Sequence, residues 1–146
     1  MITPGSAQQS LRDHVLRKAL DARARHGTPR DRAAVERIVA DRDVIRYPLT
    51  IGIDADGLDA GEFAWLEPLG ALPSDGHRLH VHPLLGPMDE LLPLVIAYYI
   101  PSVNYGDIVG PEEAEAFGAT LCGMAVEDYY ATLCAIADRL IGRGSR

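Results

Sequence analysis

Cysteine and long apolar runs are scarce in this chain of 146 residues, and each scarcity excludes a class of protein. Two cysteines, Cys122 and Cys134, make neither a disulfide scaffold nor a zinc motif. The longest apolar stretch, Leu91 to Ile100, contains Pro93 and is too short for a membrane span of about 20 residues. The sequence begins without a basic region followed by an apolar block, so we expect a cytoplasmic protein without membrane contact.

Familiar signatures of catalysis are also missing. The chain has no Gly-x-Ser-x-Gly elbow, no phosphate-binding loop and no dinucleotide fingerprint. Its composition, with 47% hydrophobic and 24% charged residues, is that of an ordinary globular protein with a core. Because no complete catalytic constellation is visible, the sequence favours a protein that is not an enzyme.

Charge is divided unevenly along the chain. Lys18 is the one lysine, and arginine supplies the other positive charges. Residues 1–46 hold ten basic and six acidic side chains, whereas residues 47–146 hold four basic and fifteen acidic ones. The net charge of −7 argues against a general nucleic-acid binder, although a nucleic-acid module in the basic N-terminal helix pair is a weaker alternative. We expect the basic part to pack against the acidic part, within one chain or across a homodimer.

Two helices are predicted in the basic N-terminal part. The first runs from a cap at Ser6 to about His26 and stops at Gly27. The second follows Thr28 as its cap, with Pro29 at the first helical position.

Three strands are predicted next. Residues 47–53 alternate apolar and other side chains, and residues 62–66 are expected to pair back on them as a hairpin. Residues 78–82 make the third strand, with Leu79 and Val81 facing the core and the histidines facing the other way. Trp65 is expected in the core, where its truncation would cost roughly 3–5 kcal/mol.

The remainder is mainly helical. Residues 91–100 predict a buried helix that ends at Pro101, although a strand over residues 94–100 is the alternative. Two helices follow, over residues 111–122 and 125–141. Their predicted inward stripe consists of Phe117, Leu121, Val126, Tyr130, Leu133, Ala137 and Leu140.

These elements define an α+β fold class. We expect a single domain over residues 1–146, with an N-terminal helix pair in residues 1–46. A small antiparallel sheet of three or four strands occupies residues 47–83, and C-terminal helices from residues 84–146 pack on one face of it.

Three histidines, His77, His80 and His82, form the densest group of reactive side chains. Alternate residues of a strand share one face, so His80 and His82 would lie side by side. Such a pair binds a divalent transition metal when His77 or a carboxylate completes the ligand set. Candidate carboxylates are those of Glu62, Glu127 and Asp128. The alternative is the polar face of an ordinary edge strand.

Five tyrosines gather in the C-terminal half, and two Tyr-Tyr pairs there should each turn one ring inward and one outward. We therefore expect a small, non-enzymatic binding or accessory protein without a cofactor, acting through protein or small-ligand contacts. Its partner would be a second copy of the chain, another protein or a small molecule. The alternative is a small metal-dependent enzyme or metal-binding protein built on His80 and His82.

Overall fold

The computed structural model describes residues 4–144 and the side chains of residues 5–140. It confirms the α+β class: this part of the chain forms five helices and one three-stranded sheet. The helices are α1 (Pro4–His26), α2 (Arg32–Val39), α3 (Leu92–Tyr105), α4 (Pro111–Leu121) and α5 (Val126–Gly144). The strands are β1 (Leu49–Ile53), β2 (Ala64–Pro68) and β3 (His77–Val81). Three short 3-10 turns cover Pro73–Asp75, Pro83–Leu85 and Gly106–Ile108.

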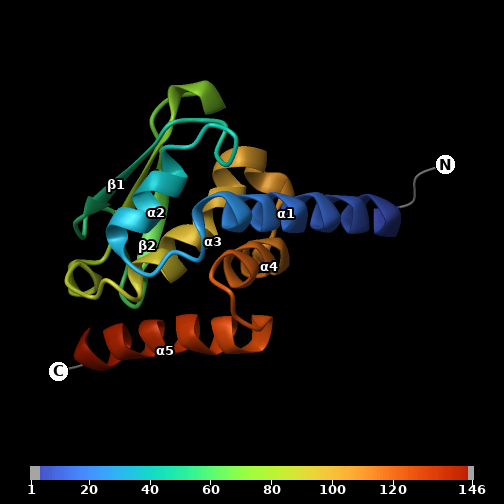
Figure 1. The fold of residues 1–146 in the computed structure, drawn as a ribbon. Coiled ribbons are helices and arrows are strands. Elements are labelled where there is room, and N and C mark those ends of the chain that lie inside the picture. Colours follow the sequence, from blue (N-terminus) through green and yellow to red (C-terminus); the bar gives the residue numbers. More distant parts are fainter. Residues whose placement is uncertain (1–3, 145–146) are drawn as a thin grey trace.

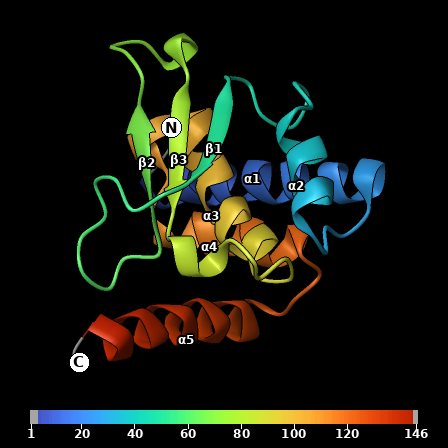
Figure 2. The same ribbon diagram turned by 90° about the vertical axis from the view of Figure 1, so that its left-hand side faces the viewer.

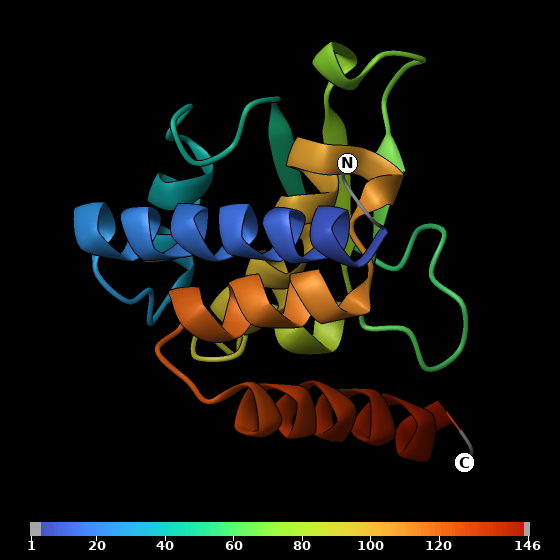
Figure 3. The same ribbon diagram turned by 90° about the vertical axis from the view of Figure 1, so that its right-hand side faces the viewer.

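The helices lie on one side of the sheet (Figure 1). Helix α3 runs directly behind the strands (Figure 2), and α1 and α4 lie side by side on the far side of α3 (Figure 3). Helix α5 packs against α4 and α3. The other face of the sheet, called the outer face below, carries no helix from the described residues (Figure 2).

The sheet is mixed, with β3 in the centre and β1 and β2 at its edges. Strand β1 pairs with β3 in parallel, so that Ile51 lies opposite Leu79. Strand β2 pairs with β3 in antiparallel fashion, with Leu66 opposite Leu79 on the other side. The predicted β1–β2 hairpin is therefore wrong, and the sheet is not wholly antiparallel. Alternation along a strand predicts which side chains share a face but not which strands become neighbours.

Helix α2 begins later than its sequence predicted. Its N-cap is Asp31, whose carboxylate accepts a hydrogen bond of 2.8 Å from the Ala34 N–H. Thr28 and Pro29 instead belong to the connection between α1 and α2. Gly27, with a φ of 78°, directly follows the last residue of α1. Thr28 and Asp31 are both residue types that cap helices. Only the Asp31 side chain accepts a hydrogen bond from the N–H three residues further along, so the helix begins there.

Helix α3 passes through Pro101 and ends at Tyr105, so the predicted stop at Pro101 and the alternative strand are both wrong. Pro93 lies in the first turn, where its missing N–H costs no helical hydrogen bond. Proline inside a helix removes a backbone hydrogen bond and costs roughly 3 kcal/mol. Here α3 is buried along most of its length, between the sheet and the other helices, and this packing outweighs the local preference. No helix in the described part of the chain is long and apolar enough to span a membrane.

The buried stripe of α5 is offset from the predicted one. Leu133 and Leu140 are buried as expected, but Val126 and Tyr130 are 44% and 55% exposed. Tyr129 is fully buried instead, and its hydroxyl donates a 2.6 Å hydrogen bond to the Leu94 carbonyl of α3. A Cβ at Gly118 of α4 would overlap the Tyr129 ring, so glycine makes this approach feasible.

Of the two Tyr-Tyr pairs, only the second divides into one buried and one exposed ring, and the buried ring is Tyr129 rather than the predicted Tyr130. Tyr129 is buried and Tyr130 exposed, whereas Tyr98 and Tyr99 are both half-buried. Both cysteines are free, as the sequence predicted. Burial raises the pKa of the Cys122 thiol to about 12, so this side chain is a small core residue rather than a nucleophile.

The basic N-terminal part does pack against the acidic remainder within one chain. Arg12 of α1 forms an ion pair with Glu112 of α4, and the Arg23 guanidinium donates a 2.9 Å hydrogen bond to the Thr120 carbonyl. Arg25 instead pairs with Asp43, inside the basic part itself. Apolar packing along α1 and α4 therefore accompanies a small number of long-range charge contacts.

Candidate functional site

His80 lies on the outer face of β3 but is only 5% exposed. Its Nδ1 is 2.6 Å from Oδ1 of Asp54, and its Nε2 is 3.0 Å from Oε1 of Glu67. The Trp65 ring lies opposite in the strand register and stacks on the imidazole, with ring centroids 5.3 Å apart. Both ring nitrogens therefore already have carboxylate partners, in a cluster that ties β2 and the end of β1 to β3.

The charges of this cluster are mutually stabilising. The Glu67 carboxylate, followed by that of Asp54, raises the pKa of His80 despite the opposing effect of burial. The pKa of Asp54 is lowered, chiefly by its hydrogen bond to His80, with a smaller contribution from Arg78. Each ring nitrogen of His80 thus faces a carboxylate, which favours the imidazolium form and leaves no nitrogen for a metal or a substrate.

The prediction that Trp65 lies in the core is wrong. The indole stands on the outer face, where its Nε1 donates a 2.7 Å hydrogen bond to the Asp56 carbonyl and its ring covers Gly57. Ala64 and Leu66 take the positions facing the helices. Apolar side chains occupy both faces of this strand, so alternation alone could not decide which face is buried.

The other two histidines occupy different environments. His82 follows the end of β3, and its Nδ1 accepts a 3.1 Å hydrogen bond from the Leu84 N–H at the start of a 3-10 turn. His77 lies outside the predicted strand but is the first residue of β3, where it shares its side with Leu79 and faces away from the side of His80. Burial lowers the pKa of His77, which favours its neutral form.

The structure does not bring the three imidazoles together on one face. Among residues 4–144, no three or more His, Cys, Asp or Glu side chains are grouped in a way that could hold a metal ion. The metal site at His77, His80 and His82 stays a prediction from the sequence.

A pocket of about 350 Å³ lies beside His77, between the β2–β3 loop and the C-terminal end of α3. Its walls include Tyr47, Leu72 and Tyr105. Two polar atoms of the wall residues are buried and have no hydrogen-bond partner among the described residues: Nδ1 of His77 and the hydroxyl of Tyr105. An unsatisfied buried polar atom costs about 1–3 kcal/mol, so this pocket is a second candidate site.

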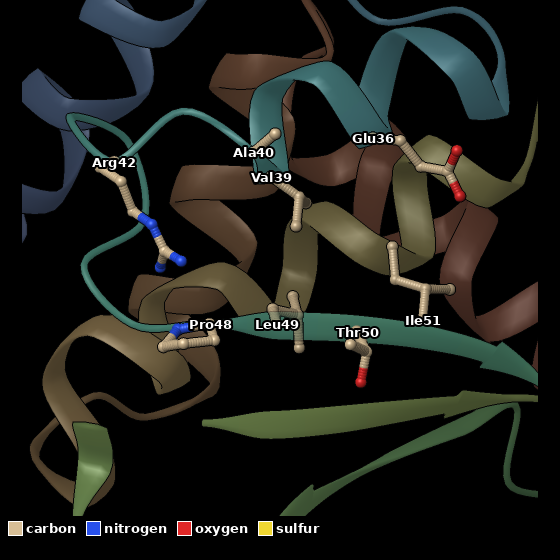
Figure 4. A pocket seen from close by; sticks show the side chains of 8 residues that line it. All are labelled: Glu36, Val39, Ala40, Arg42, Pro48, Leu49, Thr50 and Ile51. Carbon is tan, nitrogen blue, oxygen red and sulfur yellow. The ribbon is translucent and has the colours of Figure 1, made fainter. Parts of the chain in front are cut away.

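A third candidate is a groove of about 390 Å³ between α2 and the edge strand β1, called the β1 groove below. Figure 4 shows Val39 of α2 directed toward β1, with Leu49 and Ile51 on the opposite wall. Arg42 stands at the end of the groove where β1 begins, and Glu36 stands near Ile51. The groove therefore has an apolar middle with opposite charges at its ends.

The backbone of β1 offers hydrogen-bonding groups along this groove. The Pro48 carbonyl and the Asp54 N–H bond to β3, at 2.9 and 3.0 Å. The N–H and C=O groups of one strand residue point to the same edge, and successive residues alternate between the two edges, so those of Leu49, Ile51 and Ile53 point away from β3. No strand of the described residues pairs with this edge.

Comparison with models of known protein families, with curated proteins and with solved structures finds no match to this chain. The function has to be inferred from the three sites themselves. The cluster around His80 and the pocket beside His77 were both indicated in the sequence by their histidines. The β1 groove had none, because it depends on β1 being an edge strand and on α2 lying beside that edge.

Proposed function

We propose that this protein is a non-enzymatic binding protein that takes up an extended polypeptide segment in the β1 groove. The observation that carries the proposal is the open edge of β1 facing an apolar groove. A segment added to such an edge gains main-chain hydrogen bonds from the strand and specificity from alternate side chains that enter the groove. Leu49, Ile51 and Ile53 supply the main-chain groups, and Val39 supplies apolar surface on the far wall.

The position of α2 favours a single extended segment over a second sheet. Helix α2 stands beside the open edge of β1 in both side views (Figures 2 and 3), and residues of α2 and β1 line the same groove. A neighbouring sheet that joined in the plane of this one would have to displace α2. One strand needs only about 4.8 Å of spacing from β1, and its inward side chains would fill the space in front of Val39.

A soluble heptapeptide of alternating valine and threonine is a suitable probe. We expect it to shift the backbone amide signals of Leu49, Ile51 and Ile53 in NMR titrations and to slow their hydrogen exchange. Ile51→Pro should abolish these effects, because proline removes an N–H that points into the groove while leaving the bonds to β3 intact.

Leu66→Pro is the matched control. The Phe63 carbonyl bonds to β3, so alternation directs the Leu66 N–H to the open edge of β2. Both residues are half-buried, and both substitutions remove one outward N–H from an edge strand. Binding should survive in Leu66→Pro. Equal binding by both variants, or no change at the three β1 amides in the unmodified protein, would contradict the proposal.

The pocket beside His77 supports a second candidate function, the binding of a small uncharged ligand. Its specific support is the pair of unsatisfied polar atoms on His77 and Tyr105. Benzamide offers one donor and one acceptor on a flat ring and serves as the probe, with benzoate as its charged counterpart. Benzamide should perturb the His77 ring nitrogens more strongly than benzoate does, because a neutral imidazole offers no charge to a carboxylate. No response to either compound would remove this candidate.

A further inference from the structure

We infer that the segment bound in the β1 groove is the C-terminal tail of a protein, lying antiparallel to β1 with its terminal carboxylate beside Arg42. This inference rests on the proposed function and adds the direction and the chemistry of the bound segment. It draws on how the groove is closed, on the charge at each end and on the apolar middle.

The Arg42 end of the groove is closed by the chain itself. Residues 40–48 connect α2 to β1 and cross the groove where β1 begins (Figure 4). This connection is fixed by its own hydrogen bonds, including those of 3.0 Å from the N–H groups of Val44 and Ile45 to the Asp41 carbonyl. An extended segment that reaches this end has no straight path onward, so a chain terminus fits here better than an internal stretch.

The charge at the closed end selects which terminus. The guanidinium of Arg42 is directed toward Pro48 in Figure 4, and no residue of the described part pairs with it. A terminal carboxylate would gain a charge-assisted hydrogen bond from this group, whereas a terminal ammonium would be repelled. With its C-terminus at the start of β1, the bound segment runs in the direction opposite to that of β1.

The other end of the groove favours a basic side chain. Glu36 stands there, near Ile51, and among the described residues its carboxylate is bound by Arg32 alone, at 2.9 Å, in an exposed pair one helical turn apart. Such surface pairs contribute about 0.3–0.5 kcal/mol, so Glu36 can readily accept another cation. Between the ends, Val39, Leu49 and Ile51 favour apolar side chains at alternate positions of the segment.

Three synthetic peptides, two heptapeptides and one nonapeptide, test the inference. All carry an N-terminal lysine followed by alternating valine and threonine. The first ends in a free carboxylate, the second in an amide, and the third continues the first with two glycines. We expect the first to bind about tenfold more tightly than either of the others, a ratio equivalent to 1.4 kcal/mol. Isothermal titration calorimetry gives the three dissociation constants.

Charge variants assign the effect to a residue. Arg42→Gln should bind the free-acid and amide peptides equally, because the group that distinguishes them is gone. Arg37→Gln removes a charge from an exposed residue of α2 that does not line the groove, and it should keep the tenfold ratio. A ratio that persists in Arg42→Gln would overturn the inference.

The same peptides separate failure of the inference from failure of the proposed function. If all three bind equally and Ile51→Pro abolishes the binding, the groove accepts internal segments, and only the tail inference is wrong. If none binds the unmodified protein at millimolar concentration, the peptide-binding function itself is wrong.

Discussion

His77 and His80 lie three positions apart on β3, yet their surroundings give them opposite properties. His77 faces the helices, has a buried nitrogen that no described residue bonds, and has a lowered pKa. His80 faces outward, bonds a carboxylate with each nitrogen, and has a raised pKa although it is almost fully buried. Burial alone therefore does not set the charge of a histidine; the hydrogen-bond partners supplied by neighbouring strands do.

The same contrast extends to the two faces of the sheet. The face toward the helices is packed with apolar side chains such as Leu79 and Val81, both fully buried. The outer face carries Arg78, His80 and Trp65, which are held by ion pairs, hydrogen bonds and ring stacking. If this division is correct, equivalent truncations on the two faces should differ widely in their cost.

Leu79→Ala should have the largest effect. Leu79 is fully buried at the centre of the sheet, so its truncation should reduce the free energy of unfolding by about 2–5 kcal/mol. Thr50→Ala, at an exposed position of β1, should change it by no more than about 0.5 kcal/mol. Chemical denaturation measures both values. Similar losses for the two variants would show that the faces are not distinct.

Trp65→Ala should cost less than Leu79→Ala, although it removes a much larger side chain. Trp65 is half-buried and packs against His80 and Gly57 rather than against helices. We expect a loss of about 1–2 kcal/mol in the same denaturation experiment. A loss of about 3–5 kcal/mol would indicate instead that the indole lies in the core, as the sequence predicted.

His80→Gln should have a smaller effect at neutral pH, because the glutamine amide can still donate hydrogen bonds to a carboxylate. The diagnostic feature is its pH dependence. Since folding raises the pKa of His80, the stabilisation is complete below about pH 6.5 and is lost as the pH rises through the raised pKa.

Asp54 determines how the stabilisation from the same cluster is lost at acidic pH. Its pKa is lowered in the folded chain, so its contribution is present above about pH 3.8 and is lost as the pH falls through the lowered pKa. Denaturation at a series of pH values should show the wild type losing its advantage over His80→Gln on both sides of this window. A difference that is constant with pH would mean that His80 carries no charge in the folded chain.

The sequence predicted the parts of the fold that depend on periodicity and composition. The helices, the three strands and the inward position of Leu79 all follow from local patterns. The pairing of β1 with β3 could not be predicted, because it depends on contacts between segments that are distant in the sequence. The predicted helix end at Pro101 was wrong for a related reason, because tertiary packing overrides the local effect of this proline on α3.

The candidate sites were predictable to different degrees. The histidines stood out as a cluster, but their separation into three environments required knowledge of the register, the strand ends and the partners Asp54 and Glu67. The β1 groove combines Arg42 and Glu36 with an open strand edge. Nothing in the spacing of those residues distinguishes them from ordinary surface charges.

Tyr105→Phe should have the smallest effect, and of the opposite sign. The Tyr105 hydroxyl lies buried on the same side of the sheet as His77 and has no partner in the described part of the chain, so its removal should raise the free energy of unfolding by up to about 1 kcal/mol. Tyr99→Phe is the matched control on α3, because Tyr99 is also half-buried but donates a 3.1 Å hydrogen bond to the Ala64 carbonyl. That variant should lose about 0.5–1.5 kcal/mol. Thermal unfolding would then move the two melting temperatures in opposite directions. A fall in both would mean that an ordered water satisfies Tyr105, and the contrast between the two sides of β3 would then be smaller than the structure indicates.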